Sequence, residues 1–298
     1  MSAFTRLRGR AARTRFRAPL VWLRHRGLDS ADVFLASYPR SGNTMLRFML
    51  AEALTGDSSS FDHIQRIIPE IGVHGRALAV APCGGRLIKT HEPYRPEYKR
   101  AIYIYRDVRD VMLSSFARES ALDVLHIRTL EDYVLPFMRG KMTRFGSWQA
   151  HLDSFLNSPL ARNGDLLIVR FEDMRQNLEG TVARCLEFLG KEVDWSVMRA
   201  AVRNNSLENM RAKEDKAKTL PKSPGEEGRW IGKGSVQGWR QKLTREQLEM
   251  VEDFAGDMLT RLGYPTVTAS LFAEVKEHQQ DEPKGNHASA ATTSSISA

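Results

Sequence analysis

Four short apolar runs alternate with segments of helical periodicity, and this alternation limits the fold more than any other feature of the chain. The runs span residues 32–37, 86–90, 101–105 and 166–171. Short apolar runs are typical of strands that are buried on both faces, and strands separated by helices form mainly parallel sheets. The sequence therefore predicts a single α/β domain with a central, mainly parallel sheet flanked by helices.

The polar turn at residues 38–44 has the composition of an anion-binding loop. It follows the first predicted strand and precedes a helix predicted over residues 45–54, so backbone N–H groups and the positive end of the helix point toward an anion in the turn. Its candidate anion ligands are Arg40, Ser41, Gly42, Asn43 and Thr44. The loop differs from the Walker pattern because one glycine is present and no lysine follows it. We therefore expect a P-loop-like domain whose loop binds an anion without an obligatory metal.

Two further pairs of polar residues follow predicted strands at the same edge of the sheet. Arg106 follows the third strand, and Ser114 lies two turns into the next helix. An arginine can bind two phosphate oxygens at once, although an ion pair with Asp110 explains Arg106 equally well by itself. Lys89 and His91 end the second strand on one face. A histidine at this position can accept a proton from an alcohol near neutral pH.

These motifs, in this order, resemble those of the sulfotransferases that use 3′-phosphoadenosine-5′-phosphosulfate (PAPS), in particular bacterial-type members with a cytosolic-sulfotransferase-like domain. The resemblance runs over roughly residues 32–264. The matching segments are YPRSGNTM (38–45), KTH (89–91), YRDVRDVMLSS (105–115), GSW (146–148), FEDM (171–174) and GKGSVQGW (232–239). Each segment is a weak or moderate signal, and their shared order makes the resemblance specific.

The resemblance implies a role for each matching residue, with PAPS as co-substrate and no metal. Residues 40–44 would hold the 5′-phosphosulfate, and Arg106 and Ser114 would hold the 3′-phosphate. His91 would be the general base on the acceptor hydroxyl, while Lys89 and Arg40 would stabilise charge on the transferring group. The remaining implied nucleotide contacts are Met45, Phe171, Ser206, Leu207, Lys233 and Gly234.

Several positions depart from the family pattern. The departures are Arg40 in place of lysine, Met45 in place of tryptophan, Phe171 in place of tyrosine, Leu207 where phenylalanine is frequent, and Gly232 in place of arginine. They predict weaker binding of the same nucleotide. They also leave open a second interpretation, a non-catalytic nucleotide-binding or scaffold protein of the same fold. The missing Gly-Lys pair disfavours a nucleotide-dependent kinase.

The predicted acceptor is a small molecule, lipid or glycan that offers a hydroxyl or, less often, an amine. Candidate walls of its site are residues 60–83, 118–145 and 213–229, and residues 213–233 are predicted to form a long loop, either a plain surface loop or a lid. The apolar residues of these segments fit an acceptor pocket and helix packing equally well: Ile67, Ile68, Leu122, Leu125, Phe137 and Met138. The oligomeric state stays open, because the family's dimer-forming pattern is only partly present at Arg240, Thr244 and Glu249.

The positive charge of the chain is concentrated at its N-terminus. The net charge is +8, and residues 1–28 hold eight arginines and no acidic residue, so the remainder is close to neutral. The charge therefore indicates a basic arm, and we expect no nucleic-acid partner. We predict an arm over residues 1–28, a sulfotransferase-like domain over 29–265 and a C-terminal segment over 266–298 with a low-complexity, disordered tail. The arm is either a disordered solubilising segment or a peripheral contact with an anionic membrane.

The cysteines and the apolar stretches favour a cytoplasmic location. Cys83 and Cys185 are far apart in the sequence and form no CxxC pair, which favours a reducing compartment. The apolar stretches are shorter than the roughly 18 residues that a membrane-spanning helix needs. We therefore expect a cytoplasmic protein, with a membrane-peripheral one as the alternative.

Overall fold

The computed structural model describes residues 17–122, 127–220 and 225–267. Within these residues four strands form one parallel sheet in the order β2-β1-β3-β4. The strands are β1 (Val33–Ser37), β2 (Leu87–Thr90), β3 (Arg100–Tyr105) and β4 (Leu166–Arg170). The predicted α/β fold with a parallel central sheet is confirmed.

Alternate residues of β1 pack into two separate apolar layers, one on each face of the sheet. Phe34 and Ala36 belong to the first layer, and Val33 and Leu35 belong to the second. All residues of β1 and β2 are buried. This burial on both faces explains why the strands are continuous apolar runs and do not alternate with polar residues.

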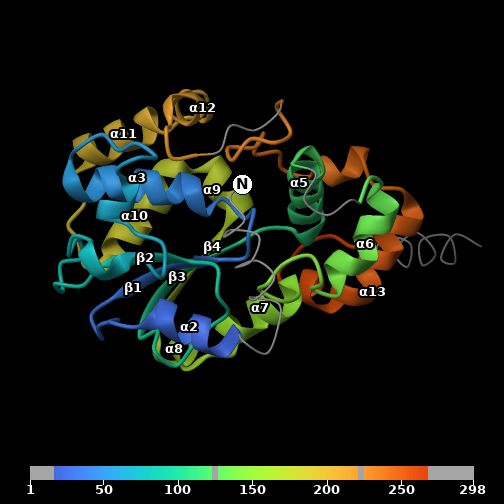
Figure 1. Ribbon diagram of the computed structural model, residues 1–298, viewed down its shortest axis with the longest axis horizontal. Coiled ribbons are helices and arrows are strands. Elements are labelled where there is room, and N and C mark those ends of the chain that lie inside the picture. The colour runs from blue at the N-terminus through green and yellow to red at the C-terminus, as the bar shows by residue number, and fades with distance from the viewer. Residues whose placement is uncertain (1–16, 123–126, 221–224, 268–298) are drawn as a thin grey trace, which may run out of the picture.

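Helices cover both faces of the sheet (Figure 1). One layer contains α3 (Asn43–Thr55), α10 (Leu178–Leu189) and α11 (Trp195–Asn204). The other contains α5 (Val108–Ala121), α6 (Leu130–Met138), α7 (Trp148–Leu156) and α13 (Arg245–Arg261). Further elements are α4 (Ile64–Ile67), η1 (His74–Arg76), α8 (Pro159–Asn163), α9 (Phe171–Gln176), α12 (Leu207–Lys216) and η2 (Gly238–Gln241).

Two predicted element boundaries are wrong. The fourth strand ends at Arg170, and Phe171 begins α9, whose first turn holds Glu172 and Asp173. Carboxylates stabilise the positive end of a helix, so the chain turns there although Phe171 is apolar. Helix α12 extends to Lys216, so the start of the predicted loop at residues 213–233 is helical.

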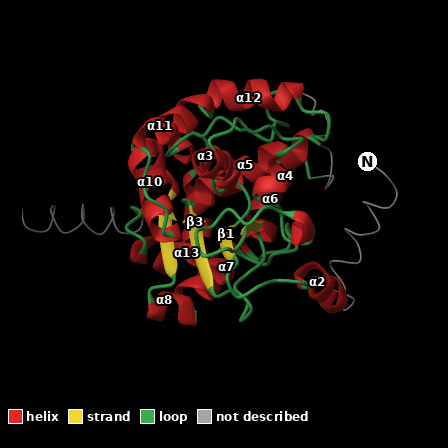
Figure 2. Cartoon of the chain, turned by 90° about the vertical axis from the view of Figure 1, so that its left-hand side faces the viewer, coloured by secondary structure: helices red, strands yellow, loops and turns green. Residues whose placement is uncertain are grey.

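The last part of the predicted basic arm is not disordered, because α2 (Arg17–His25) is a helix that packs on the domain (Figure 2). His25 is buried, and its Nε2 lies 2.8 Å from the Tyr98 hydroxyl. Burial lowers the pKa of His25, which favours the neutral ring in this contact. Residues 1–16 and the predicted C-terminal tail lie outside the described residues. Along the described parts of the chain, no helix combines the length and apolar character needed to cross a bilayer.

Candidate active site

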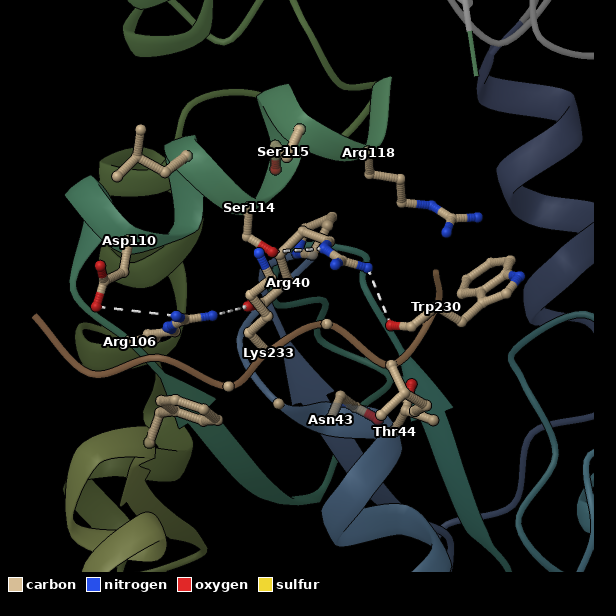
Figure 3. Close-up of a pocket in the computed structure, with 18 of the residues that line it drawn as sticks. Arg40, Asn43, Thr44, Arg106, Asp110, Ser114, Ser115, Arg118, Trp230 and Lys233 are labelled. Atoms are coloured by element: carbon tan, nitrogen blue, oxygen red, sulfur yellow. Dashed lines mark hydrogen bonds and ion pairs between the residues drawn. The ribbon is translucent and has the colours of Figure 1, made fainter. Parts of the chain in front are cut away.

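The carboxyl ends of β1, β2 and β3 face one cavity of about 430 Å³ (Figure 3). Parallel sheets bind ligands at this edge because loops and helix N-termini converge there. The cavity is lined by Arg40 from the β1–α3 loop, by Lys89 and His91 after β2, and by Arg106 and Ser114 after β3. The structure thus brings together the three groups of residues that the sequence singles out at strand ends.

The β1–α3 loop passes very close to the aromatic ring of Phe171. Gly42 has a φ of 92°, in the left-handed region, and a Cβ atom there would lie 2.5 Å from Cδ2 of Phe171. Arg40 also has a positive φ, of 68°. Glycine is required at position 42 for two reasons, the backbone conformation and the closeness of the ring.

Gly42→Ala is expected to lower the free energy of unfolding by about 1–3 kcal/mol more than the matched change Gly56→Ala does. Both glycines have a left-handed φ, 92° and 79°, but a Cβ at Gly56 would meet no atom within 4 Å. The difference between the variants therefore isolates the collision with Phe171. Urea unfolding measures both values, and equal losses would contradict the close approach.

Arg40 is half-buried in this cavity beside other cations. Its Nε donates to Ser114 Oγ at 2.9 Å, and its Nη1 donates to the Trp230 carbonyl at 3.2 Å (Figure 3). Burial, together with the guanidinium groups of Arg118 and Arg106, lowers the pKa of Arg40 to about 10. The mutual repulsion of these cations is relieved by an anion, so the cavity favours an anionic ligand.

Arg106 lies at the centre of the contacts behind the loop. It donates to the Arg40 carbonyl at 3.1 Å and to the Ser235 carbonyl at 2.7 Å, and its guanidinium lies 4.5 Å from the centre of the Phe171 ring. The alternative ion pair with Asp110 is also present, with a distance of 3.8 Å between Arg106 Nη2 and Asp110 Oδ2. The structure therefore shows Arg106 both in that ion pair and on the cavity wall.

Three buried polar atoms of the β1–α3 loop and of Arg106 lack a hydrogen-bond partner among the described residues. They are Ser41 Oγ, Asn43 Oδ1 and Arg106 Nε. Buried polar groups are nearly always paired, so the two donors among these atoms, Ser41 Oγ and Arg106 Nε, fit a site that receives ligand oxygens.

His91 is held in one tautomer by the backbone of β1. Its Nδ1 lies 2.8 Å from the Ser37 carbonyl, which can only accept a hydrogen bond, so Nδ1 carries the proton. Burial and the Lys89 ammonium lower the pKa of His91 to about 3. The imidazole is therefore neutral at pH 7 and its Nε2 keeps a lone pair. That arrangement allows Nε2 to accept a proton.

Lys89 has a carboxylate neighbour that the sequence pattern does not reveal. The Lys89 Nζ lies 4.0 Å from Glu70 Oε2. The two side chains meet because residues 69–71 pair with the end of β2. In this pairing the Lys89 N–H donates to the Pro69 carbonyl and the Ile71 N–H donates to the Lys89 carbonyl, both at 2.8 Å. Burial lowers the pKa of Lys89 to about 8, and Glu70 opposes this shift. No spacing signal in the sequence connects Glu70 with Lys89.

The other predicted site residues fall into two groups. Those that line the same cavity are Gly42, Asn43, Thr44, Met45, Phe171, Leu207, Lys233 and Gly234. Ser41 and Ser206 are not among the lining residues. Ser41 is fully buried, and the Ser206 hydroxyl caps α12 by accepting from the Asn209 N–H. The Asn43 side-chain amide donates to the Leu35 carbonyl at 3.1 Å and to Ser37 Oγ at 3.2 Å, which ties the loop to β1.

The predicted acceptor walls are only partly at the cavity. From the predicted wall 118–145, the residues Arg118, Leu122 and Phe145 line it, together with Trp230, which lies outside the predicted walls. The other apolar candidates within the described residues serve the core instead: Ile67, Ile68, Phe137 and Met138. Leu125 lies outside the described residues. The described residues contain no group of three or more histidine, cysteine, aspartate or glutamate side chains placed to hold a metal ion.

Comparison with known proteins gives consistent matches. The profile of the family described as "Sulfotransferase domain" matches residues 30–263. An amine sulfotransferase of Oryctolagus cuniculus is 25% identical over 73% of this chain and 77% of its own length. A flavonol sulfotransferase-like protein of Flaveria bidentis is 26% identical over 79% of this chain and 84% of its own length.

Solved structures share the fold at lower sequence identity. Retinol dehydratase in complex with androsterone and the inactive cofactor PAP has a TM-score of 0.61 and 22% identity over 78% of this chain and 81% of its own. The mouse sulfotransferase SULT7A1 complexed with PAP has a TM-score of 0.59 and 20% identity over 78% of this chain and 87% of its own length.

Proposed function

Because this chain belongs to the sulfotransferase domain family, we propose that it transfers a sulfuryl group from PAPS to a hydroxyl of a small molecule, lipid or glycan. One observation carries the proposal. The cationic β1–α3 loop and a neutral His91 with a free Nε2 lone pair line the same cavity. Retinol dehydratase and mouse SULT7A1 have been solved with PAP, which supports the same nucleotide here.

The proposed nucleotide site uses both sides of the cavity. The loop residues 40–44 would bind the phosphosulfate through backbone N–H groups and the Arg40 guanidinium. Arg106 and Ser114 would bind the 3′-phosphate, and Ser114 Oγ also accepts from Arg40 Nε. Lys233 and Gly234 would cover the nucleotide from the segment after Trp230. These donors fit the unpaired Ser41 and Arg106 atoms described above.

The proposed reaction is an in-line displacement at sulfur. The acceptor oxygen forms a new S–O bond while the bond from sulfur to the bridging oxygen of PAPS breaks, and 3′,5′-bisphosphoadenosine leaves. His91 Nε2 takes the proton of the acceptor hydroxyl. Lys89 and Arg40 stabilise the negative charge that grows on the bridging oxygen. The Ser37 carbonyl accepts a hydrogen bond from the Nδ1–H of His91, so Nε2 is the nitrogen that takes the proton of the acceptor.

Calorimetric titration tests the nucleotide proposal. We expect 3′,5′-bisphosphoadenosine to bind roughly 10–150-fold more tightly than 5′-AMP, because one charge-assisted contact contributes about 1.5–3 kcal/mol. The variant Arg106→Gln should remove most of this preference while it leaves 5′-AMP binding nearly unchanged. Equal affinity of the parent for both nucleotides would exclude a site that recognises the 3′-phosphate.

A second candidate function is a non-catalytic nucleotide-binding or scaffold protein. Gly232, where the family pattern has an arginine, favours this candidate: a Cβ there would lie 3.1 Å from Arg40 Nη2, so the position holds no side chain beside the loop. Arg229 does not replace the missing arginine, because it is paired with Asp215 at 3.0 Å and is not among the cavity-lining residues. Tight nucleotide binding without sulfuryl transfer to any tested acceptor would favour this candidate.

A further inference from the structure

The described surface has an unusual concentration of exposed apolar side chains at one place. Eight large hydrophobic residues of the described chain are exposed, and four of them lie on α2 and the loop around η1. These four are Trp22, Leu23, Val73 and Leu78. Trp22 is 64% exposed and Leu23 is 59% exposed. Most of the surface of these two adjacent residues is therefore left outside the packing of the domain.

Helix α2 and the η1 loop form one continuous surface, which we call the α2 face. His74 Nε2 lies 3.2 Å from the Arg26 carbonyl, and a Cβ at Gly72 would lie 3.1 Å from Arg24 Cγ. Arg86 joins the two segments, since it donates to the Gly27 carbonyl at 2.9 Å and to the His74 carbonyl at 3.2 Å. The exposed apolar residues are therefore presented by a fixed support at the periphery of the molecule (Figure 2).

The charge of the α2 face is mainly positive, although the exposed Asp29 directly follows it. Residues 1–28 contain no acidic residue, and neither do residues 71–91. Arg26, Arg66 and Arg76 are exposed on or beside this face. Exposed tryptophan and leucine side chains surrounded by arginines are typical of protein surfaces that lie at an anionic bilayer, where apolar groups enter the acyl boundary and cations meet the headgroups.

We propose that the α2 face docks on the surface of an anionic lipid bilayer. A nucleic acid would satisfy the arginines, but it offers no apolar region for Trp22, Leu23 and Val73. A bilayer satisfies both kinds of side chain. The exposed Arg26, Arg66 and Arg76 add attraction of about 1 kcal/mol each to an anionic surface at close range, so they act together with the apolar residues.

The α2 face is connected to the candidate catalytic residues through contacts of Arg24. Its residue Arg24 donates to the Ile71 carbonyl at 3.2 Å, and its Nη1 lies 3.7 Å from Glu92 Oε1, one residue after His91. Ile71 in turn donates to the Lys89 carbonyl. A bilayer on this face would therefore lie close to the end of β2. This step rests on the proposed function, and it favours an acceptor that is dissolved in the lipid over a glycan.

Sedimentation of the full chain with vesicles tests the docking. The probes are vesicles of phosphatidylcholine alone and of phosphatidylcholine with about one third phosphatidylserine, without any nucleotide. We expect binding to the anionic vesicles only. The double variant Trp22→Ser/Leu23→Ser should bind them at least about tenfold more weakly, because its apolar contribution is lost. The variant Val73→Ser/Leu78→Ser should weaken binding in the same direction without altering α2.

The matched control is Trp195→Ser, which removes a tryptophan that is 50% exposed at the start of α11, on another element. It should bind vesicles as the parent does. If both double variants bind like the parent, the arginines alone are sufficient and the proposal is overturned. Binding to duplex RNA or to a second copy of the chain, without binding to vesicles, would overturn it as well. Vesicle binding by a protein that fails to bind 3′,5′-bisphosphoadenosine would exclude the proposed function and leave the docking intact.

Discussion

Replacing His91 with alanine is expected to lower the turnover of sulfuryl transfer roughly 10²–10⁴-fold, the range found when a general base is removed. The reason lies in the fixed tautomer. The Nδ1 proton is bound to the Ser37 carbonyl at 2.8 Å, so Nε2 is the nitrogen that can accept a proton. Alanine removes this imidazole nitrogen from the cavity. The rate of sulfuryl transfer from PAPS, monitored through the release of 3′,5′-bisphosphoadenosine, measures this loss of turnover.

Nucleotide affinity should hardly change in the His91 variant, because the proposed phosphate contacts come from the β1–α3 loop and from α5. The control is His63→Ala, which removes an exposed histidine whose Nδ1 lies 3.1 Å from Ser60 Oγ. It should retain parental turnover. Near-parental turnover of the His91 variant would exclude His91 as the base. Glu92 would then be the next candidate for the general base. It is buried, and its Oε1 lies 3.7 Å from Arg24 Nη1.

Replacing Arg109 with leucine is expected to lower the free energy of unfolding by about 3–5 kcal/mol, the cost of breaking a buried ion pair from one side. Arg109 is fully buried, and its Nη2 lies 2.8 Å from Asp107 Oδ2 while its Nη1 lies 3.4 Å from Glu252 Oε1. It also donates to the Pro265 carbonyl at 2.8 Å and stacks 3.8 Å above the Trp239 ring. Leucine leaves the two carboxylates buried with like charge.

Urea unfolding, followed by circular dichroism, measures this effect. The matched control is Arg245→Leu, which removes an exposed ion pair with Glu249 of 2.9 Å, and exposed pairs contribute little to stability. Its unfolding midpoint should stay at the parental value. If both variants lose the same stability, the contacts of Arg109 contribute no more than a surface pair does.

The Arg109 variant should also bind the nucleotide more weakly at the candidate active site. Asp110 follows Arg109 in α5, and its carboxylate accepts from the Gln237 N–H at 2.9 Å and from the Trp239 N–H at 3.1 Å. These bonds hold the segment that also carries Lys233 and Gly234. Weaker binding of 3′,5′-bisphosphoadenosine at temperatures where the variant is still folded would show this coupling.

The sequence predicted the sheet and the strand-end loops because their signals are local. An apolar run such as residues 32–37 predicts a strand buried on both faces from its own composition. The turn after it is predicted to bind an anion from its own glycine and polar residues. The order of the motifs then predicted that they meet at one edge, since all parallel strands end there. The same reasoning failed at Phe171, because an apolar residue at a strand end is compatible with either the strand or the next helix.

The sequence by itself therefore determined the parallel α/β fold and the meeting of Arg40, His91 and Arg106 at one cavity, and it predicts that the β1–α3 loop binds an anion. Only the tertiary structure decided which partners these residues have. The Glu70 carboxylate beside Lys89, the Ser37 carbonyl behind His91 and the Tyr98 hydroxyl at His25 all depend on contacts across the fold, and the last pair is separated by 73 residues. Periodicity and spacing describe neighbours along the chain, whereas burial, tautomer and pairing are set by neighbours in space.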